Sequence, residues 1–188
     1  MQKVRITPVA PEPEDPQLRE ELTRWMPPGT GKEPLVLFRS LATHPTLMQA
    51  MRPLGAFLLG RRTGLTLRQR ELLILRVCAR CRCEYEWGVH VAGFGAAAGL
   101  DAATVAATWH GAADAACFAP DESALLAAVD ELCAGPALSD ATWAALGEHF
   151  ADAQRLEILA AAGWYRLIST LCNGLALAPE PWAATLAS

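Results

Sequence analysis

Apolar residues recur every three or four positions along most of the chain, which is the spacing that gathers them on one face of an α-helix. One such segment is opened by Thr66 and Gln69, which form a capping-box pattern at a helix N-terminus. Its apolar positions are Leu67, Leu72, Leu75 and Cys78. No segment of useful length alternates with the period of two that a strand requires. The pattern therefore predicts an all-α fold.

Residues that start or stop helices set the expected boundaries. Asp101 and either Ser139 or Asp140 are typical N-caps, and Gly99 suits the position that follows a helix C-terminus. Pro53 is expected to kink or break the helix that contains it. The expected helices cover residues 18–26, 35–43, 46–59, 66–82, 83–99, 101–109, 122–133, 142–150 and 153–172.

The chain divides into a short N-terminal part and one helical domain. Prolines cluster in residues 8–16, and proline removes backbone donors and disfavours helix at the preceding residue. Residues 1–33 are therefore expected to form a proline-rich arm with a short helix. Residues 34–188 are expected to form the helical domain, because 188 residues is an ordinary length for one domain.

Composition excludes several classes of function. Hydrophobic residues make up 52% of the chain and charged residues 19%, which is enough for a sizeable core. The net charge of −4 gives no electrostatic reason to expect a nucleic-acid partner. No apolar run reaches the roughly 20 residues of a membrane span, and the N-terminus lacks the apolar core of a signal peptide. We therefore expect a cytoplasmic protein without a membrane partner.

Six cysteines occur without a secretory signal, which argues against a disulfide framework. Three of them, Cys117, Cys133 and Cys172, stand in apolar helical surroundings and are expected to be inert core residues. The other three, Cys78, Cys81 and Cys83, fall within six positions of one another.

Four residues could form a proton-transfer site. An α-helix turns about 100° per residue, so Cys83, Glu86 and His90 share one face of a helix. Glu86 and His90 are four residues apart and close enough to interact. Cys83 stands at the helix N-terminus, where the helix dipole favours a thiolate. Glu71, on the preceding helix, could fold back onto the same face.

These residues carry a resemblance to a known family. The run from Arg70 to Arg76 and the segment from His90 to Leu100 resemble the carboxymuconolactone decarboxylase family and its alkyl hydroperoxidase D-like branch. That branch carries a glutamate, eleven residues, Cys-x-x-Cys, three residues and a histidine. Glu71, Cys83 and His90 match this motif in register. The resemblance covers about residues 35–110. It implies a compact helical bundle without a cofactor or metal, assembled as a homo-oligomer, either a dimer or a trimer of dimers.

The motif departs from the branch at one position, because Glu86 replaces the second cysteine. In the branch, the two thiols cycle between dithiol and disulfide, and glutamate cannot form that disulfide. The charges of Glu84 and Glu86 would also raise the pKa of Cys83. Cys81 is too close along the chain to pair easily with Cys83, and Cys78 would require a bend between the helices. A Cys78–Cys81 redox pair and a zinc site of these cysteines with His90 are weaker alternatives.

Several residues also have structural interpretations. Glu86 and His90 could form an ion pair at a subunit contact without chemistry. Tyr85 and Trp87 are candidates for a substrate pocket, although core or interface packing is the more common role of such aromatics. The remaining histidines are expected in structural positions: His44 in a turn, His110 at a helix C-terminus and His149 on the surface.

Three functions remain open. The first is a cofactor-independent enzyme in which Glu86 and His90, supported by Glu71, move a proton on a small carbonyl, lactone or carboxylate substrate. Decarboxylation of a β-keto-type acid fits such acid/base residues. The second is a thiol-dependent alkyl hydroperoxide reductase-like antioxidant protein, a peroxidase-related oxidoreductase that uses Cys83. The third is a non-catalytic ligand-binding or sensor protein on the same scaffold.

Overall fold

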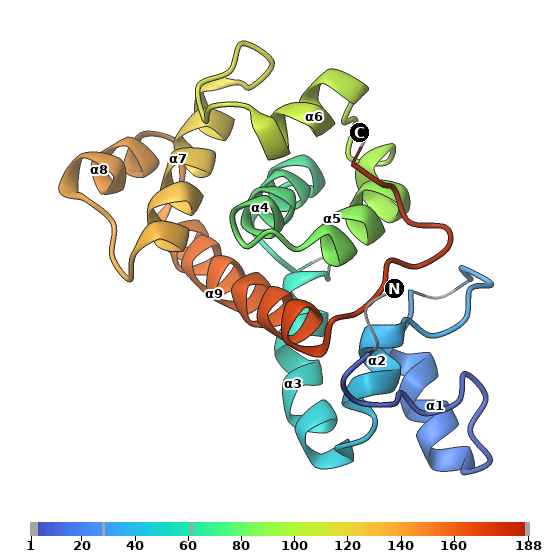
Figure 1. The fold of residues 1–188 in the computed structure, drawn as a ribbon. Coiled ribbons are helices and arrows are strands. Elements are labelled where there is room, and N and C mark those ends of the chain that lie inside the picture. Colours follow the sequence, from blue (N-terminus) through green and yellow to red (C-terminus); the bar gives the residue numbers. More distant parts are fainter. Residues whose placement is uncertain (1–3, 28, 61, 187–188) are drawn as a thin grey trace.

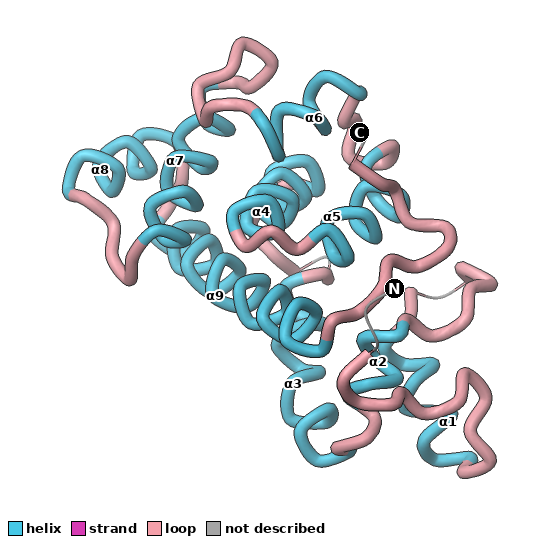
Figure 2. Tube along the Cα trace, in the orientation of Figure 1, coloured by secondary structure: helices cyan, strands magenta, loops and turns pink. Residues whose placement is uncertain are grey.

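The computed structural model describes residues 4–27, 29–60 and 62–186 (Figure 1). Of the expected N-terminal arm, residues 1–3 and 28 therefore lie outside the described residues. Within the described ranges the chain forms nine α-helices and one π-helical turn, with loops and no strand between them (Figure 2). The predicted all-α class is confirmed.

The helices follow one another closely along the chain. Their bounds are α1 Pro16–Trp25, α2 Val36–Leu41, α3 Pro45–Leu58, α4 Leu67–Arg80, α5 Glu84–His90, the π-helical turn Val91–Gly95, α6 Ala102–His110, α7 Pro120–Ala134, α8 Asp140–His149 and α9 Asp152–Leu175.

The capping residues predicted from the sequence have the expected geometry. Thr66 and Gln69 form both hydrogen bonds of the capping box at α4, and Asp101 accepts from the backbone N–H of Thr104 at the start of α6. Gly99 has a φ of +67°, a left-handed conformation that glycine adopts without strain. The predicted helix from 83 to 99 is not uniform, because it changes to π-helical geometry at Val91.

Two expectations concern α3. Of the kink or break predicted at Pro53, the break is absent, because the helix runs from Pro45 to Leu58 with Pro53 inside it. His44 is the N-cap of α3 rather than a simple turn residue, since its side chain accepts a hydrogen bond from the backbone N–H of Leu47. A proline directly after this cap suits the first helical position.

Helix α4 lies at the centre of the domain, with α5, α6, α7 and α9 arranged around it (Figure 1). Eight consecutive residues of α4, from Glu71 to Cys78, are buried. Among them, Arg76 forms a two-pronged ion pair with Asp130 of α7, at 2.6 and 2.7 Å. Arg76 also donates to the carbonyl of Gly111, beyond the end of α6. A fully buried guanidinium thus joins α4 to both neighbours.

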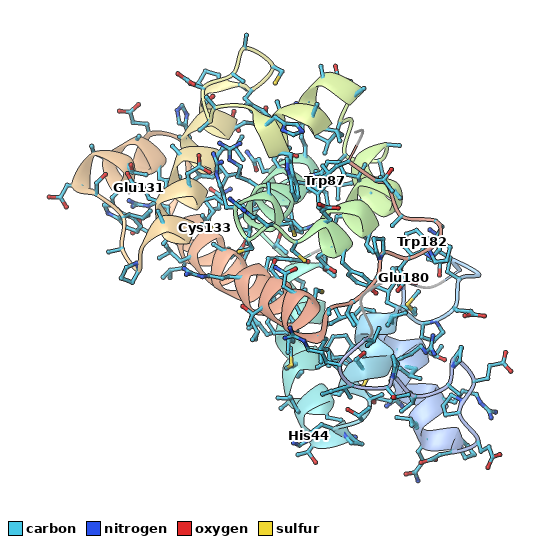
Figure 3. All side chains as sticks on the ribbon, in the orientation of Figure 1. His44, Trp87, Glu131, Cys133, Glu180 and Trp182 are labelled. Atoms are coloured by element: carbon cyan, nitrogen blue, oxygen red, sulfur yellow. The ribbon has the colours of Figure 1, made fainter. Side chains whose placement is uncertain are left out.

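The C-terminal segment after α9 returns along α5. The backbone N–H of Ala184 donates to the carbonyl of Gly88 at 3.0 Å. Glu180 accepts hydrogen bonds from the Tyr85 hydroxyl and from the backbone N–H of Val36. Figure 3 labels Glu180 and Trp182 in this segment, close to α5 and α2. The tail therefore connects α5 to the N-terminal helices.

Over the part of the chain that the structure describes, no helix combines the length and apolarity needed to cross a membrane.

Candidate functional site

The structure brings Glu71, Glu86 and His90 together. The Nδ1 atom of His90 lies 2.7 Å from Oε2 of Glu71, and its Nε2 atom lies 3.3 Å from Oε1 of Glu86. Glu71 comes from α4 and the other two from α5, so the site forms where these helices pack together. The predicted fold-back of Glu71 onto the face of Glu86 and His90 is therefore present.

The surroundings of this triad fix its orientation. Glu71 is fully buried, and its second oxygen accepts from Nε of Arg70 at 3.1 Å. The imidazole of His90 is 3% exposed and has Tyr165 against it edge-on, with ring centroids 5.3 Å apart. The ring of Phe94 lies on another side, 5.2 Å away. The histidine can thus exchange protons with the two carboxylates but is screened from bulk water.

The two carboxylates govern the charge of His90. Burial by itself lowers the pKa of an imidazole, but the charge and hydrogen bond of Glu71, together with those of Glu86, outweigh it and raise the pKa of His90 to about 10. At neutral pH the imidazole is therefore protonated, with Nδ1–H donating to Glu71 and Nε2 forming an ion pair with Glu86 at 3.3 Å.

Glu86 also faces open space. It lines a cavity of about 270 Å³, whose walls include Trp25, Arg52 and Tyr165. It lines a second cavity of about 210 Å³ as well, together with His90 and Trp182. Both cavities share walls from the N-terminal helices and from α5, and their linings are largely apolar. Glu86 therefore connects the triad to two adjoining cavities that are large enough for a small molecule.

Three polar atoms of the larger cavity's wall residues are buried without a hydrogen-bond partner in the described ranges: Oε2 of Glu86, Nε1 of Trp25 and Nε of Arg52. A buried polar atom without a partner costs free energy, on the order of 1–3 kcal/mol. A ligand that accepts from Trp25 and Arg52 and donates to Glu86 would satisfy all three. Trp25 and Arg52 were not found from the sequence, because nothing in the local pattern relates α1 or α3 to α5.

Cys83 stands at a helix N-terminus, as predicted, but away from the two cavities. It is the N-cap of α5, is fully buried and lines neither of the two cavities. A hydrogen bond from the thiol of Cys172 lowers its pKa, against the effect of burial, and the charge of Glu86 does not reverse this. The charge of Glu86 acts in the predicted direction and raises the pKa of Cys83, but the neighbouring Cys172 outweighs it, so the net shift is downward.

The three cysteines expected to be inert core residues also differ from one another. Cys172 of α9 is buried, as expected, but lies beside Cys83. Cys117 and Cys133 are only half-buried. The sequence alone did not predict the contact between Cys83 and Cys172, because the two residues are 89 positions apart (172 − 83).

Tyr85 and Trp87, the two pocket candidates, lie in the core and line neither cavity with Glu86. The Tyr85 hydroxyl accepts from the backbone N–H of Leu37 and donates to Glu180. The Trp87 indole donates to Thr108 at 3.0 Å and packs edge-on against Trp109. Both aromatics connect α5 to neighbouring segments.

The same region of the chain matches a family model. Residues 45–131, which contain all four predicted site residues, match the model described as the carboxymuconolactone decarboxylase family. Over this segment the chain is similar to the carboxymuconolactone decarboxylase family. The predicted resemblance, based on Glu71, Cys83 and His90, is confirmed. No curated protein sequence gives a significant match to this chain.

Solved structures show the same fold over nearly the whole chain. An uncharacterised peroxidase-related protein from Ralstonia eutropha, described as an alkylhydroperoxidase AhpD core, is 19% identical with a TM-score of 0.81, and the match covers 96% of this chain and 95% of that one. A debrominase in complex with 2,3,4-tribromopyrrole is 15% identical with a TM-score of 0.78, and the match covers 95% of this chain and 93% of that one. A peroxidase-related protein from Silicibacter is 15% identical with a TM-score of 0.71, over 79% and 78% of the two chains. At these identities the similarity establishes the alkyl hydroperoxidase D-like fold.

No group of three or more histidine, cysteine, aspartate or glutamate side chains within the described ranges is arranged to hold a metal ion.

Proposed function

We propose that this protein is a cofactor-independent enzyme that transfers a proton to or from a small carboxylate or carbonyl substrate bound beside Glu86. The observation that carries the proposal is the set of unpaired polar atoms of Glu86, Trp25 and Arg52 around one largely apolar cavity. An apolar chamber with a few converging polar groups is the usual form of a small-molecule site.

Glu86, His90 and Glu71 have different roles in the proposed reaction. Oε1 of Glu86 is bonded to His90, so its Oε2 is the atom that meets the substrate as general base. His90, protonated at neutral pH, supplies the proton that later returns to the substrate. Glu71 is a positioning residue, because it holds the imidazole from the opposite side and does not line either cavity.

The donors on the wall indicate the class of substrate. The N–H groups of Trp25 and Arg52 can bind a carboxylate or carbonyl oxygen, and Arg52 adds positive charge. A β-keto acid or a lactone carries such oxygens next to an exchangeable proton. In decarboxylation, the carbon–carbon bond to the carboxylate breaks, the electron pair moves to the carbonyl as an enolate, and the proton from His90 ends on carbon.

The comparisons with known proteins support this proposal at the level of the family and the fold. The family of residues 45–131 is named for a decarboxylase, and the fold also occurs in a debrominase bound to a small ring, 2,3,4-tribromopyrrole. A cavity of about 270 Å³ suits a molecule of that size.

A panel of small keto acids, lactones and their neutral analogues would test the proposal. We expect Glu86→Gln to lower kcat at least about 100-fold with little change in KM, since general acid–base groups contribute on that scale. Arg52→Gln and Trp25→Phe should instead weaken binding of the acids about 10-fold and leave binding of the neutral analogues unchanged.

Arg24→Gln is the matched control, because Arg24 lines the same cavity but its guanidinium is paired with Glu20 at 2.6 Å. Equal losses in the Arg24 and Arg52 variants would contradict the assigned anion contact. Binding of a small molecule without turnover of any member of the panel would favour a ligand-binding or sensor protein instead.

A second candidate function is thiol-based reduction of hydroperoxides at Cys83, favoured by the thiol of Cys172 beside it. Cys172 would then take the place of the missing motif cysteine. We expect, for this candidate, rapid loss of both thiols after one equivalent of an organic hydroperoxide, and mass mapping of a Cys83–Cys172 disulfide. Slow loss, or loss that persists in Cys83→Ser, would exclude it.

A further inference from the structure

The two cavities beside Glu86 adjoin each other. Glu86, Trp25, Phe38 and Phe94 are among the residues that line both. The cavities measure about 270 and 210 Å³. Neither one alone reaches the roughly 300 Å³ at which pockets for drug-sized ligands begin, but the two together exceed it. A ligand in contact with Glu86 can therefore extend into both cavities.

The unpaired polar groups are distributed unevenly between the two cavities. Arg52, whose Nε atom is buried without a partner, lines only the larger cavity. Trp25 and Glu86 belong to the wall that the cavities share. Among the described residues, no side chain that lines only the smaller cavity has a buried polar atom without a partner. An apolar group can therefore enter the smaller cavity without leaving a further polar atom unpaired.

Aromatic rings dominate the walls of the smaller cavity. Trp25, Phe38 and Phe94 contribute three of them, and Trp182 of the C-terminal tail adds a fourth (Figure 3). The ammonium of Lys32 lies 3.3 Å from the centroid of the Trp182 ring, a cation–π contact that stabilises this position of the indole. Because aromatic pairs gain free energy beyond their buried area, these walls favour an aromatic ligand group over an aliphatic one.

The π-helical turn after α5 leaves the smaller cavity open at one side. Ala92 and Gly93 belong to this turn, line the cavity and are exposed. At Gly93 a Cβ atom would meet no atom within 4 Å. Single π-helical turns are frequent at functional sites. The space beside Gly93 is thus available to a ligand, and a large side chain at this position would narrow it.

We propose that the smaller cavity is a subsite for an apolar, preferably aromatic, arm of the substrate, and that Gly93 and Trp182 determine this specificity. The substrate is then a keto acid or lactone whose anionic group binds Arg52 and Trp25, whose reacting carbon lies beside Glu86, and whose arm extends under Trp182. This inference rests on the proposed function and narrows its substrate class.

The test measures equilibrium binding of unreactive ligands to the full-length protein at pH 7 by calorimetry. Butyrate and 4-phenylbutyrate carry the same carboxylate and differ only in the phenyl ring. We expect the ring to tighten binding at least about 10-fold, which corresponds to burial of a side chain such as phenylalanine. Adipate, whose second carboxylate could instead reach Lys32, should bind more weakly than 4-phenylbutyrate.

Two variants alter the subsite from different walls. Gly93→Leu fills the space beside the π-helical turn, and Trp182→Ala removes an aromatic wall. Each should reduce the preference for 4-phenylbutyrate over butyrate at least about fivefold, with little change in the binding of butyrate itself. Trp143→Ala is the control, because this indole is 40% exposed and lines neither cavity.

Arg52→Gln separates this inference from the proposed function. It should weaken both acids equally and leave binding of the neutral 4-phenyl-1-butanol unchanged. If Arg52→Gln affected neither acid while the preference for the ring remained sensitive to Gly93→Leu, the anion contact of the proposed function would fail and the subsite would stand. Equal binding of the two acids, a preference unchanged in both subsite variants, tighter binding of adipate, or no binding of any of these ligands would overturn the subsite.

Discussion

His90 is hydrogen-bonded through Nδ1 to Oε2 of Glu71 across the interface of α4 and α5, at 2.7 Å. Both side chains are almost completely buried, at 3% and 0% exposure. A buried ion pair of this kind contributes little net stability by itself but is costly to break, because one charge is then left without a partner. Loss of the contact between Glu71 and His90 would therefore alter the geometry of the site and lower the stability of the fold.

The first prediction concerns the pH dependence of stability. The pKa of His90 is raised from 6.5 to about 10 in the folded state. Its contribution is therefore fully present below about pH 6.5 and is lost as the pH rises toward 10, on the order of 1 kcal/mol per pH unit. Urea unfolding of wild type and His90→Gln at pH 6, 8 and 10 should show a stability difference that shrinks with pH. A constant difference would contradict a protonated His90.

The second prediction separates the two carboxylates. Glu71→Gln should lower the free energy of unfolding by about 3 kcal/mol, because Glu71 is paired with both His90 and Arg70 in the interior. Glu86→Gln should cost less than about 1 kcal/mol, since one of its oxygens has no partner among the described side chains. Chemical denaturation of both variants at pH 7 measures the difference. A larger loss for Glu86 than for Glu71 would reverse the assigned roles.

Local signals in the sequence predicted the framework of the site well. The capping box at Thr66, the N-cap at Asp101 and the left-handed Gly99 depend on neighbouring residues. The spacing of Glu86 and His90 likewise follows from helix geometry alone. The position of Glu71 opposite His90 required only that two consecutive helices form a hairpin, which their connection favours.

Contacts between distant helices could not be predicted in the same way. Trp25 and Arg52 reach the Glu86 cavity from α1 and α3, and the sequence does not reveal how these helices face α5. The proximity of Cys83 and Cys172 likewise depends on helices far apart in the chain. The π-helical turn at Val91 has no sequence signal that distinguishes it from ordinary helix.

The third prediction concerns the ion pair that joins α4 to α7. Asp130→Asn should lower the free energy of unfolding by about 3 kcal/mol, because it leaves the guanidinium of Arg76 buried without a carboxylate. Arg80→Gln is the matched control. Arg80 also binds Asp130 at 2.6 Å, but its side chain is 37% exposed, so the loss should be below about 1 kcal/mol. Equal losses in the two variants would contradict the central role of Arg76.

Acid titration extends the same test. Burial raises the pKa of Asp130, but its hydrogen bonds with Arg80 and Arg76 outweigh this and hold the pKa below the usual range. A lowered carboxyl pKa gives stability that is present above about pH 4 and is lost as the pH falls through the folded-state value. Wild type should therefore lose more stability in acid than Asp130→Asn, as measured by urea unfolding between pH 5 and 3.

The fourth prediction concerns Gly88, where the C-terminal tail contacts α5. A Cβ atom at this position would collide with the backbone carbonyl oxygen of Ala184, and the carbonyl of Gly88 accepts from the N–H of the same residue. A backbone group cannot rotate away as a side chain can. Gly88→Ala should therefore displace the tail, although alanine favours a helix by about 1 kcal/mol over glycine.

Displacement of the tail has a measurable consequence at the Glu86 site. Trp182 of the tail lines the smaller cavity together with Glu86 and His90, and Lys32 lies over its ring, 3.3 Å from the centroid. Gly88→Ala should speed proteolysis after α9 and increase the solvent exposure of Trp182, measured by limited digestion and fluorescence quenching. Gly174→Ala is the control, because a Cβ atom there meets no atom within 4 Å. If the tail stayed protected in both variants, the close packing at Gly88 would not be what holds the tail against α5. The smaller cavity would then have to be closed by wall residues other than Trp182.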